Sequence, residues 1–101
     1  MNIQKNVNGN TYELLVAGRV DGEGANQLEE QILQAIQADA QNIYVNLERA
    51  TFLCSAGLRV LMQYWRQMKS RQKLLQATRP SPETDVVLAA SGFREMLVEK
   101  I

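Results

Sequence analysis

Residues 46–58 read NLERATFLCSAGL, and this stretch passes from a strand into a helix. Ile43, Val45 and Leu47 alternate with polar neighbours, which predicts a strand over roughly Asn42–Leu47. A short apolar extension, Phe52-Leu53-Cys54, leads into a second periodic segment. Its apolar residues recur at steps of three and four, as expected for one face of a helix: Leu58, Leu61, Met62, Trp65 and Met68. The opposite face of that helix carries Arg59, Gln63, Arg66, Ser70 and Lys73.

The strand-to-helix junction combines a serine with two small residues. Ser55 is a preferred helix cap, since its hydroxyl can accept a hydrogen bond from an orphaned backbone N–H. Ala56 and Gly57 leave the first helical turn almost without side chains, which suggests close approach by another backbone or by a partner. Spacing places Ser55 and Arg59 on the same side of the helix, away from the apolar stripe. Two interpretations are open: a plain cap-and-turn, or a binding surface.

Toward the N-terminus, Asn8-Gly9 predicts a type I′ hairpin turn between strands Ile3–Val7 and Tyr12–Ala17. The segment from Gly18 through Gly24 is predicted to be a turn-rich connection. An amphipathic helix follows from Ala25 to about Ala38, with helically spaced apolar residues Leu28, Ile32, Ala35 and Ile36.

Toward the C-terminus, Lys73–Thr78 is a strand candidate. Ser81-Pro82 is a typical helix start, Gly92 a plausible end, and Phe93, Met96 and Leu97 predict a short closing helix. The order of elements predicts one α/β domain over residues 1–101. Its sheet is mixed and four- to five-stranded, an N-terminal hairpin followed by β-α-β-α-β, with about four helices.

Composition removes several classes of function. The chain has no histidine and one cysteine, so the usual serine or cysteine nucleophile pairs and the common zinc and copper ligand sets are missing. No phosphate-binding glycine loop is present. We therefore expect no enzyme activity, no metal and no cofactor.

The same composition bears on location. The longest apolar run, Val86–Ala90, is too short to span a bilayer, and the start of the chain lacks the layout of a signal peptide. A single cysteine fits a reducing compartment. We expect a cytoplasmic protein without direct membrane insertion.

The charges sum to zero but are segregated along the chain. A net charge of zero argues against nucleic-acid binding. Every charged residue between Glu48 and Glu83 is basic: Arg49, Arg59, Arg66, Lys69, Arg71, Lys73 and Arg79. Among the charged residues of the first 48 positions, acidic ones predominate, with only Lys5 and Arg19 basic. Two interpretations are open. The chain has two solvated helices of opposite charge, or the basic segment binds an acidic partner or an added phosphate.

Four motifs in order resemble the STAS domain, the fold of bacterial anti-sigma factor antagonists and of the cytoplasmic tail of sulfate transporters. The resemblance covers the whole chain. It rests on Gly18-Arg19-Val20-Asp21, on Tyr44-Val45-Asn46-Leu47, on Cys54-Ser55-Ala56-Gly57-Leu58, and on Ala90-Ser91-Gly92-Phe93 with Met96-Leu97.

The resemblance implies a protein-binding switch controlled by phosphorylation, and we expect the chain to be a monomer. In such antagonists the serine at the position of Ser55 is phosphorylated by an anti-sigma factor that is also a kinase, and a phosphatase resets it. The unmodified form binds that factor and the phosphorylated form releases it. The implied phosphoacceptor is Ser55, and the implied partner-binding residues are Asp21, Gly22, Cys54, Ser55, Ala56, Gly57 and Arg59.

One residue departs from the family pattern, because Cys54 stands where the family has an acidic residue before the serine. Cys54 is either a buried small apolar residue or a redox-sensitive thiol. Asp21 has two interpretations as well, a helix cap or part of the binding surface. Two further functions stay open: a non-phosphorylated STAS subunit with a structural or regulatory role in another complex such as a transporter, and a small-ligand or nucleotide-binding domain.

Overall fold

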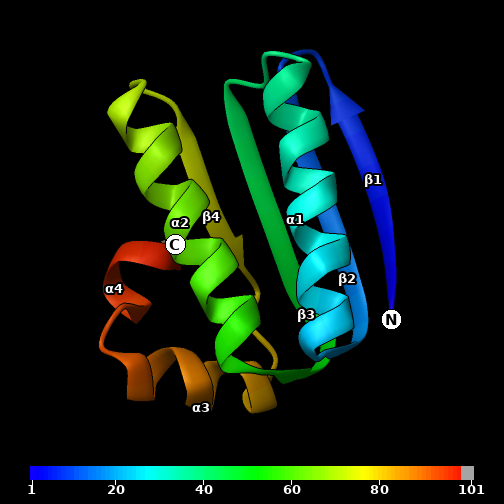
Figure 1. Ribbon diagram of the computed structural model, residues 1–101, viewed down its shortest axis with the longest axis vertical. Helices are drawn as coiled ribbons and strands as arrows, with labels where there is room; N and C mark the ends of the chain where they lie inside the picture. The colour runs from blue at the N-terminus through cyan, green and yellow to red at the C-terminus, as the bar shows by residue number, and fades with distance from the viewer. Residues whose placement is uncertain (99–101) are drawn as a thin grey trace.

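The structure, a computed structural model, describes residues 1–98 of the chain (Figure 1). Strands and helices follow one another in the order β1 (Asn2–Asn8), β2 (Thr11–Val20), α1 (Gly22–Gln37), β3 (Asn42–Leu53), α2 (Ser55–Ser70), β4 (Leu74–Thr78), α3 (Pro82–Ser91) and α4 (Arg94–Leu97). The predicted α/β domain with about four helices is confirmed.

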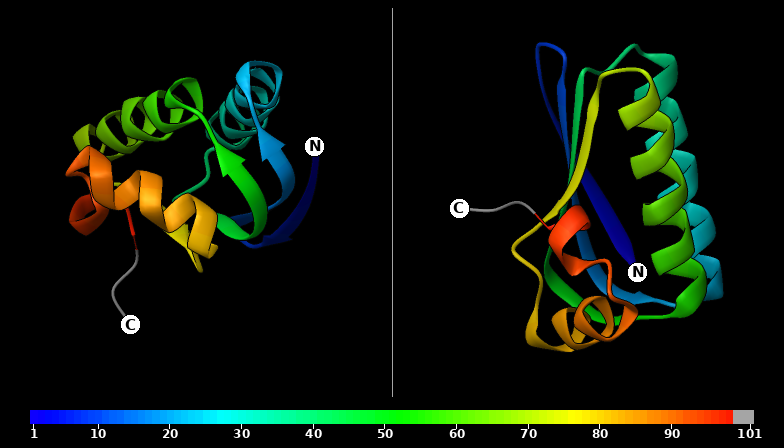
Figure 2. Two further views of the ribbon diagram at one scale, coloured as in Figure 1. Left: turned by 90° about the horizontal axis from the view of Figure 1, so that it is seen from below. Right: turned by 90° about the vertical axis from the view of Figure 1, so that its left-hand side faces the viewer.

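The sheet has four strands in the order β1-β2-β3-β4. β1 runs antiparallel to β2, while β3 lies parallel to both β2 and β4. The sheet is therefore mixed, as predicted. Helices α1 and α2 cover one face, and α3 lies at the end of the sheet where β2 and β3 finish (Figure 2). Among residues 1–98, no helix covers the other face, which the right-hand view of Figure 2 shows edge-on.

The N-terminal hairpin forms as expected, but its turn is different. Asn8 pairs with Thr11, so the two loop residues are Gly9 and Asn10. Gly9 has a φ of 62°, and Asn10 is not in the left-handed region. A positive φ at the first loop residue alone is the pattern of a type II′ turn, so the predicted type I′ turn is wrong.

The predicted turn-rich segment from Gly18 through Gly24 is also wrong. β2 continues to Val20 and α1 begins at Gly22, so a single residue joins them. Gly18 has a φ of 97° and lies beside a register shift between Gly18 and Arg19. A glycine with positive φ inside a strand marks a β-bulge, and the sequence alone does not distinguish this from a turn.

β3 is longer than predicted. It extends past Leu47 to Leu53, because the extended β2 lies beside it and pairs Val20 with Leu53. The stretch read as a short apolar extension is thus the last part of a strand. This carries β3 to the same end of the sheet as β2.

The core lies between the sheet and the helices. β3 contributes Ile43, Val45 and Leu47, none of them measurably exposed, and α1 contributes its predicted residues Leu28, Ile32 and Ala35. At the C-terminal end, Ser81 caps α3 by accepting a hydrogen bond from the Thr84 N–H, and Gly92 ends α3 with a left-handed φ of 81°. Both boundaries were predicted.

The buried face of α2 differs from the predicted stripe. Leu61, Met62 and Met68 are buried as expected, but Leu58 and Trp65 are only partly buried. Val60 and Tyr64 take their place in the core because α1 packs beside α2 and covers that side. The Tyr64 hydroxyl donates a 2.7 Å hydrogen bond to Glu29 of α1. Lys73, assigned to the helix from sequence, lies beyond its end at Ser70 and binds Asp39 at 2.6 Å.

The partial exposure of Trp65 leads to a prediction about stability. Leu61→Ala should cost about 2–5 kcal/mol of unfolding free energy, because a fully buried side chain leaves a cavity. Trp65→Ala should cost less, about 1–2 kcal/mol, since part of the ring already contacts solvent and Lys69. Urea unfolding followed by circular dichroism measures both. A larger cost for Trp65→Ala than for Leu61→Ala would contradict this core.

The contact between α1 and α2 leads to a second prediction. Burial, together with the hydrogen bond to Glu29, raises the pKa of Tyr64 to about 12 from 10.0. Because the pKa is higher in the folded state, this stabilisation is complete below pH 10 and is lost as the pH rises toward 12. NMR titration of ring-labelled tyrosine should show one signal titrating near 12, absent from Tyr64→Phe. If that signal persists in the variant, the assignment is wrong.

Candidate functional site

The ends of two parallel strands meet at the strand-to-helix junction. Val20 pairs with Leu53, and the backbone N–H of Cys54 donates to the carbonyl of Val20 at 2.9 Å. Asp21 directly follows β2, and Ser55 follows Cys54 after β3. Both residues therefore lie at the same end of the sheet, next to two neighbouring strands. This end is the usual position of binding sites in α/β proteins.

Helices α1 and α2 start differently at this end. Asp21 is the N-cap of α1, and its carboxylate accepts a 2.9 Å hydrogen bond from the Gly24 N–H. The N-cap of α2 is Cys54, and it makes no side-chain capping hydrogen bond. Ser55 is the first residue of the helix rather than its cap, so the interpretation of Ser55 as a plain cap, one of the two left open by the sequence, is wrong.

The first turn of α2 is consequently left without a side-chain cap. The N–H groups of Ser55, Ala56 and Gly57 have no acceptor inside the helix, as in the first turn of any α-helix. Ser55 is exposed, and within residues 1–98 its hydroxyl has no hydrogen-bond partner. Arg59, one turn further along, is exposed as well. These groups together give the start of α2 a positive electrostatic character.

Gly57 allows α2 to pack closely on the strand ends. A Cβ atom at this position would lie 2.8 Å from both Leu53 Cδ1 and Val20 Cγ1. The sequence predicted close approach by another backbone or by a partner, whereas the structure places two side chains of the same chain there. Because Gly57 is buried and has no side chain, the first turn of α2 can lie directly against Val20 and Leu53.

The remaining predicted site residues surround Ser55 at varying depth. Gly22 is exposed, whereas Ala56 is partly buried. Cys54 is a free thiol that is also partly buried. The structure therefore brings together, at one end of the sheet, the seven residues named from sequence: Asp21, Gly22, Cys54, Ser55, Ala56, Gly57 and Arg59.

Sequence reasoning missed the residues that support this junction. Val20 and Leu53 are buried beneath the start of α2. Arg19 lies over the Phe52 ring at 4.3 Å, next to the same strand ends. Only the β2–β3 register reveals these pairs, since each joins residues far apart in the sequence.

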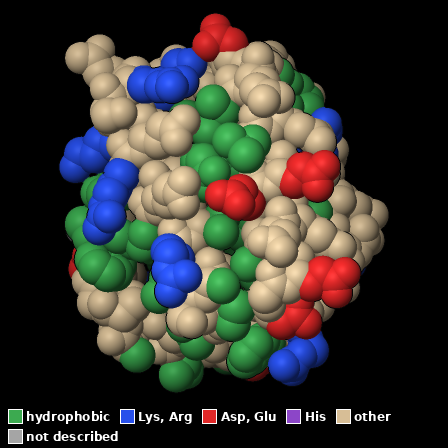
Figure 3. Space-filling model, viewed as in Figure 1, with side chains coloured by type: hydrophobic (Ala, Val, Ile, Leu, Met, Phe, Trp, Pro, Cys, Tyr) green, Lys and Arg blue, Asp and Glu red, His purple; other side chains and the backbone are tan. Residues whose placement is uncertain are grey.

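The segregation of charge along the sequence is also visible on the surface. On the face shown in Figure 3, basic side chains gather mostly over α2 and acidic ones mostly over α1. Lys73 pairs with Asp39 and Arg79 with Glu48. Within the described residues, Arg59, Arg66 and Arg71 on the α2 side are in no ion pair.

Residues 1–98 hold no cluster of three or more His, Cys, Asp or Glu side chains placed to bind a metal ion. In the same range, no helix combines the length and the apolar character required to cross a membrane.

The sequence matches the family model described as the Mlab STAS domain over residues 3–99, so the chain belongs to the STAS domain family. A curated relative is the anti-sigma-B factor antagonist of Staphylococcus aureus. It is 25% identical over 97 residues, which cover 96% of this chain and 90% of the relative. That relative is named as a regulatory protein and not as an enzyme.

Solved structures of anti-sigma factor antagonists share this fold. SpoIIAA in its unphosphorylated form is 22% identical, with a TM-score of 0.84 over 98% of this chain and 89% of its own. The Bacillus cell fate determinant SpoIIAA in the phosphorylated form is 24% identical, with a TM-score of 0.76 over 98% of this chain and 92% of its own. The similarity therefore extends over almost the full length of both molecules.

The packing of Gly57 leads to a prediction with a matched control. Gly57→Ala should cost about 1–3 kcal/mol of unfolding free energy, because the added methyl group overlaps Val20 and Leu53. At Gly22 an added Cβ meets nothing within 4 Å, so Gly22→Ala should change stability by less than about 0.5 kcal/mol. Thermal unfolding of both variants measures the difference. Equal effects would show that the junction tolerates displacement of α2.

Proposed function

We propose that this chain is a protein-binding switch module of the anti-sigma factor antagonist type, with its docking surface around Ser55. The observation that carries the proposal is the uncapped start of α2, where the Ser55 hydroxyl is exposed and unpartnered within residues 1–98. The neighbouring Asp21 and Gly22 extend the surface to the start of α1. The curated relatives named as anti-sigma factor antagonists support the same general role.

Ser55 is proposed as the phosphoacceptor, modified by a partner serine kinase that acts as the anti-sigma factor. A phosphoserine carries a charge of about −1.5 to −2 at neutral pH, and the unpaired N–H groups and Arg59 at the start of α2 favour it within the chain. The same charge and bulk oppose a close protein contact. A loss of about 3 kcal/mol in binding free energy lowers affinity more than 100-fold.

In this proposal the chain is the substrate of phosphorylation and not its catalyst. It contains no histidine, so Ser55 lacks the usual general base. The kinase therefore supplies the chemistry, and a phosphatase restores the unmodified serine. The protein acts as a monomer through this one surface.

A second candidate is a non-phosphorylated STAS subunit with a structural or regulatory role in another complex, such as a transporter. Cys54 favours this second candidate, because the phosphorylated antagonists that the chain resembles have an acidic residue at that position. The description of the matching family model, the Mlab STAS domain, does not name an anti-sigma factor antagonist. In this case the same surface binds its partner permanently.

Substitutions at Ser55 distinguish the two candidates. Affinity capture from the native cell, followed by mass spectrometry, should recover the same partner with the wild type and with Ser55→Ala. Ser55→Asp should lose it by at least tenfold, and Ser70→Asp, an exposed serine at the far end of α2, should not. With the partner kinase and ATP, intact mass should rise by one phosphate in the wild type but not in Ser55→Ala.

Two outcomes would overturn the switch. Equal recovery with Ser55→Ala and Ser55→Asp, together with no phosphate on Ser55, would support the permanent subunit instead. Loss of the partner in Ser70→Asp as well would place the docking surface elsewhere on α2.

A further inference from the structure

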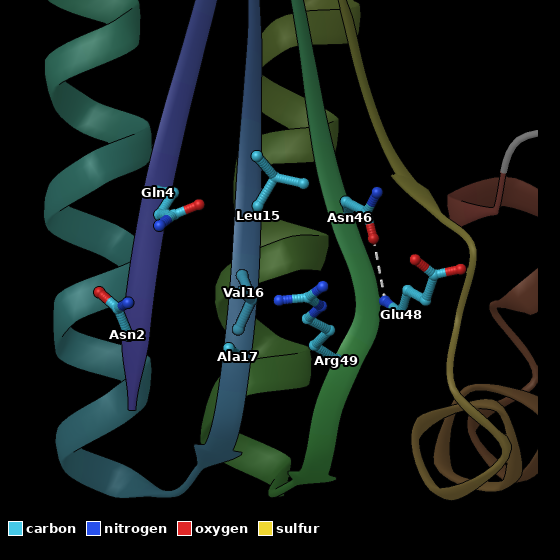
Figure 4. A pocket seen from close by; sticks show the side chains of 8 residues that line it. All are labelled: Asn2, Gln4, Leu15, Val16, Ala17, Asn46, Glu48 and Arg49. Atoms are coloured by element: carbon cyan, nitrogen blue, oxygen red, sulfur yellow. Dashed lines mark hydrogen bonds between the residues drawn. The ribbon is translucent and has the colours of Figure 1, made fainter.

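A pocket of about 250 Å³ lies on the open face of the sheet, away from the helices (Figure 4). Side chains of β1, β2 and β3 line it, among them Gln4, Leu15 and Arg49. Drug-sized ligands usually occupy about 300–1,000 Å³, so this pocket suits a smaller molecule. The proposed function does not use it.

A β-bulge shapes the pocket. Leu15 pairs with Asn46 and Ala17 with Arg49, so β3 has two residues where β2 has only Val16. Glu48 and Arg49 are therefore both exposed between buried Leu47 and Ala50. A bulge commonly redirects a side chain next to a functional site.

Asn46 holds the bulge in place. Its side chain is only 8% exposed, and its carbonyl oxygen accepts a 2.9 Å hydrogen bond from the Glu48 N–H. Its amide donates to Glu13 at 3.4 Å. The direction of the two charged side chains that follow is thus fixed by a buried polar group.

The bulge sends Glu48 and Arg49 in opposite directions. Figure 4 shows the Arg49 guanidinium over the space between β2 and β3, while the Glu48 side chain points toward β4. Glu48 lies 3.6 Å from Arg79. Arg49 forms no ion pair with any group in residues 1–98. The pocket lining consequently carries one guanidinium that is in no ion pair within residues 1–98, and one carboxylate, Glu48, which points away from it toward β4 and Arg79.

The rest of the lining has a polar part and an apolar part. Asn2 and Gln4 on β1 present amide groups that make no side-chain hydrogen bond within residues 1–98. Leu15 and Ala17 on β2 provide a short apolar floor beside Arg49. A ligand that fits has one negative charge and a small hydrocarbon part.

We propose that this pocket binds a small aliphatic monocarboxylate. The planar guanidinium of Arg49 pairs with the two carboxylate oxygens, and the Asn2 and Gln4 amides offer further donors. The alkyl chain contacts Leu15 and Ala17. A dianion such as phosphate fits less well, because a single guanidinium faces it and the Glu48 carboxylate lies on the same bulge.

Titration with sodium butyrate, followed by amide NMR shifts at constant ionic strength, tests the site. Saturable shifts should appear in β1, β2 and β3 around the pocket. Affinity should rise about fourfold for each buried methylene from acetate to butyrate, in line with apolar burial. Arg49→Gln should weaken butyrate binding at least tenfold, while Arg66→Gln, an exposed arginine on α2, should leave it unchanged.

Three results would overturn the site. The first is the absence of saturable shifts at the pocket up to the highest butyrate concentration. The second is equal butyrate affinity in Arg49→Gln and the wild type, when both have the same thermal unfolding midpoint. The third is an equal response to chloride or phosphate, which would indicate a general anion effect.

Discussion

The contact of α2 with the strand ends is the constraint on which the rest of the structure depends. Gly57 packs against Val20 and Leu53, and the Cys54 N–H binds the Val20 carbonyl. These contacts join β2, β3 and α2 at a single point. Backbone geometry and buried packing hold Ser55 and Asp21 in place. The Asp21 side chain caps α1, and the Ser55 side chain makes no hydrogen bond within residues 1–98. The surface therefore rests on buried, closely packed side chains, while the Ser55 hydroxyl is exposed and can contact a partner.

Of the three longer helices, α1 and α3 have a side-chain cap at their first turn and α2 has none. Asp21 caps α1, and Ser81 caps α3, where its hydroxyl also donates to the Ala50 carbonyl of β3. These two caps use side-chain oxygen atoms to satisfy N–H groups. Cys54 does not, so α2 keeps donors that an anion or a partner can occupy. The difference lies in one residue, a cysteine at the position where the STAS pattern has an acidic residue.

Sequence reasoning succeeded where a residue has one local physical meaning. Ser81-Pro82 marks a helix start and Gly92 a left-handed end, and both lie where local rules put them. It failed where tertiary neighbours decide. Gly18 serves a bulge instead of a turn, because its positive φ suits either. Tyr64 is buried and Trp65 only partly, because α1 covers one side of α2, and a helical stripe counted in isolation does not include that neighbour. The pocket at Arg49 depends on strand register, which no local pattern encodes.

The parallel arrangement of β3 also sets the order of folding events. The β1–β2 hairpin closes over a two-residue loop, so its pairing is local and rapid. Both parallel pairs of β3, by contrast, join residues about thirty positions apart, and each waits for a helical crossover to close the loop. Until then the apolar residues Ile43, Val45 and Leu47 of the central strand stay unpaired. During synthesis this strand is therefore exposed to aggregation, and the speed with which α1 and α2 pack against it determines how long that exposure lasts.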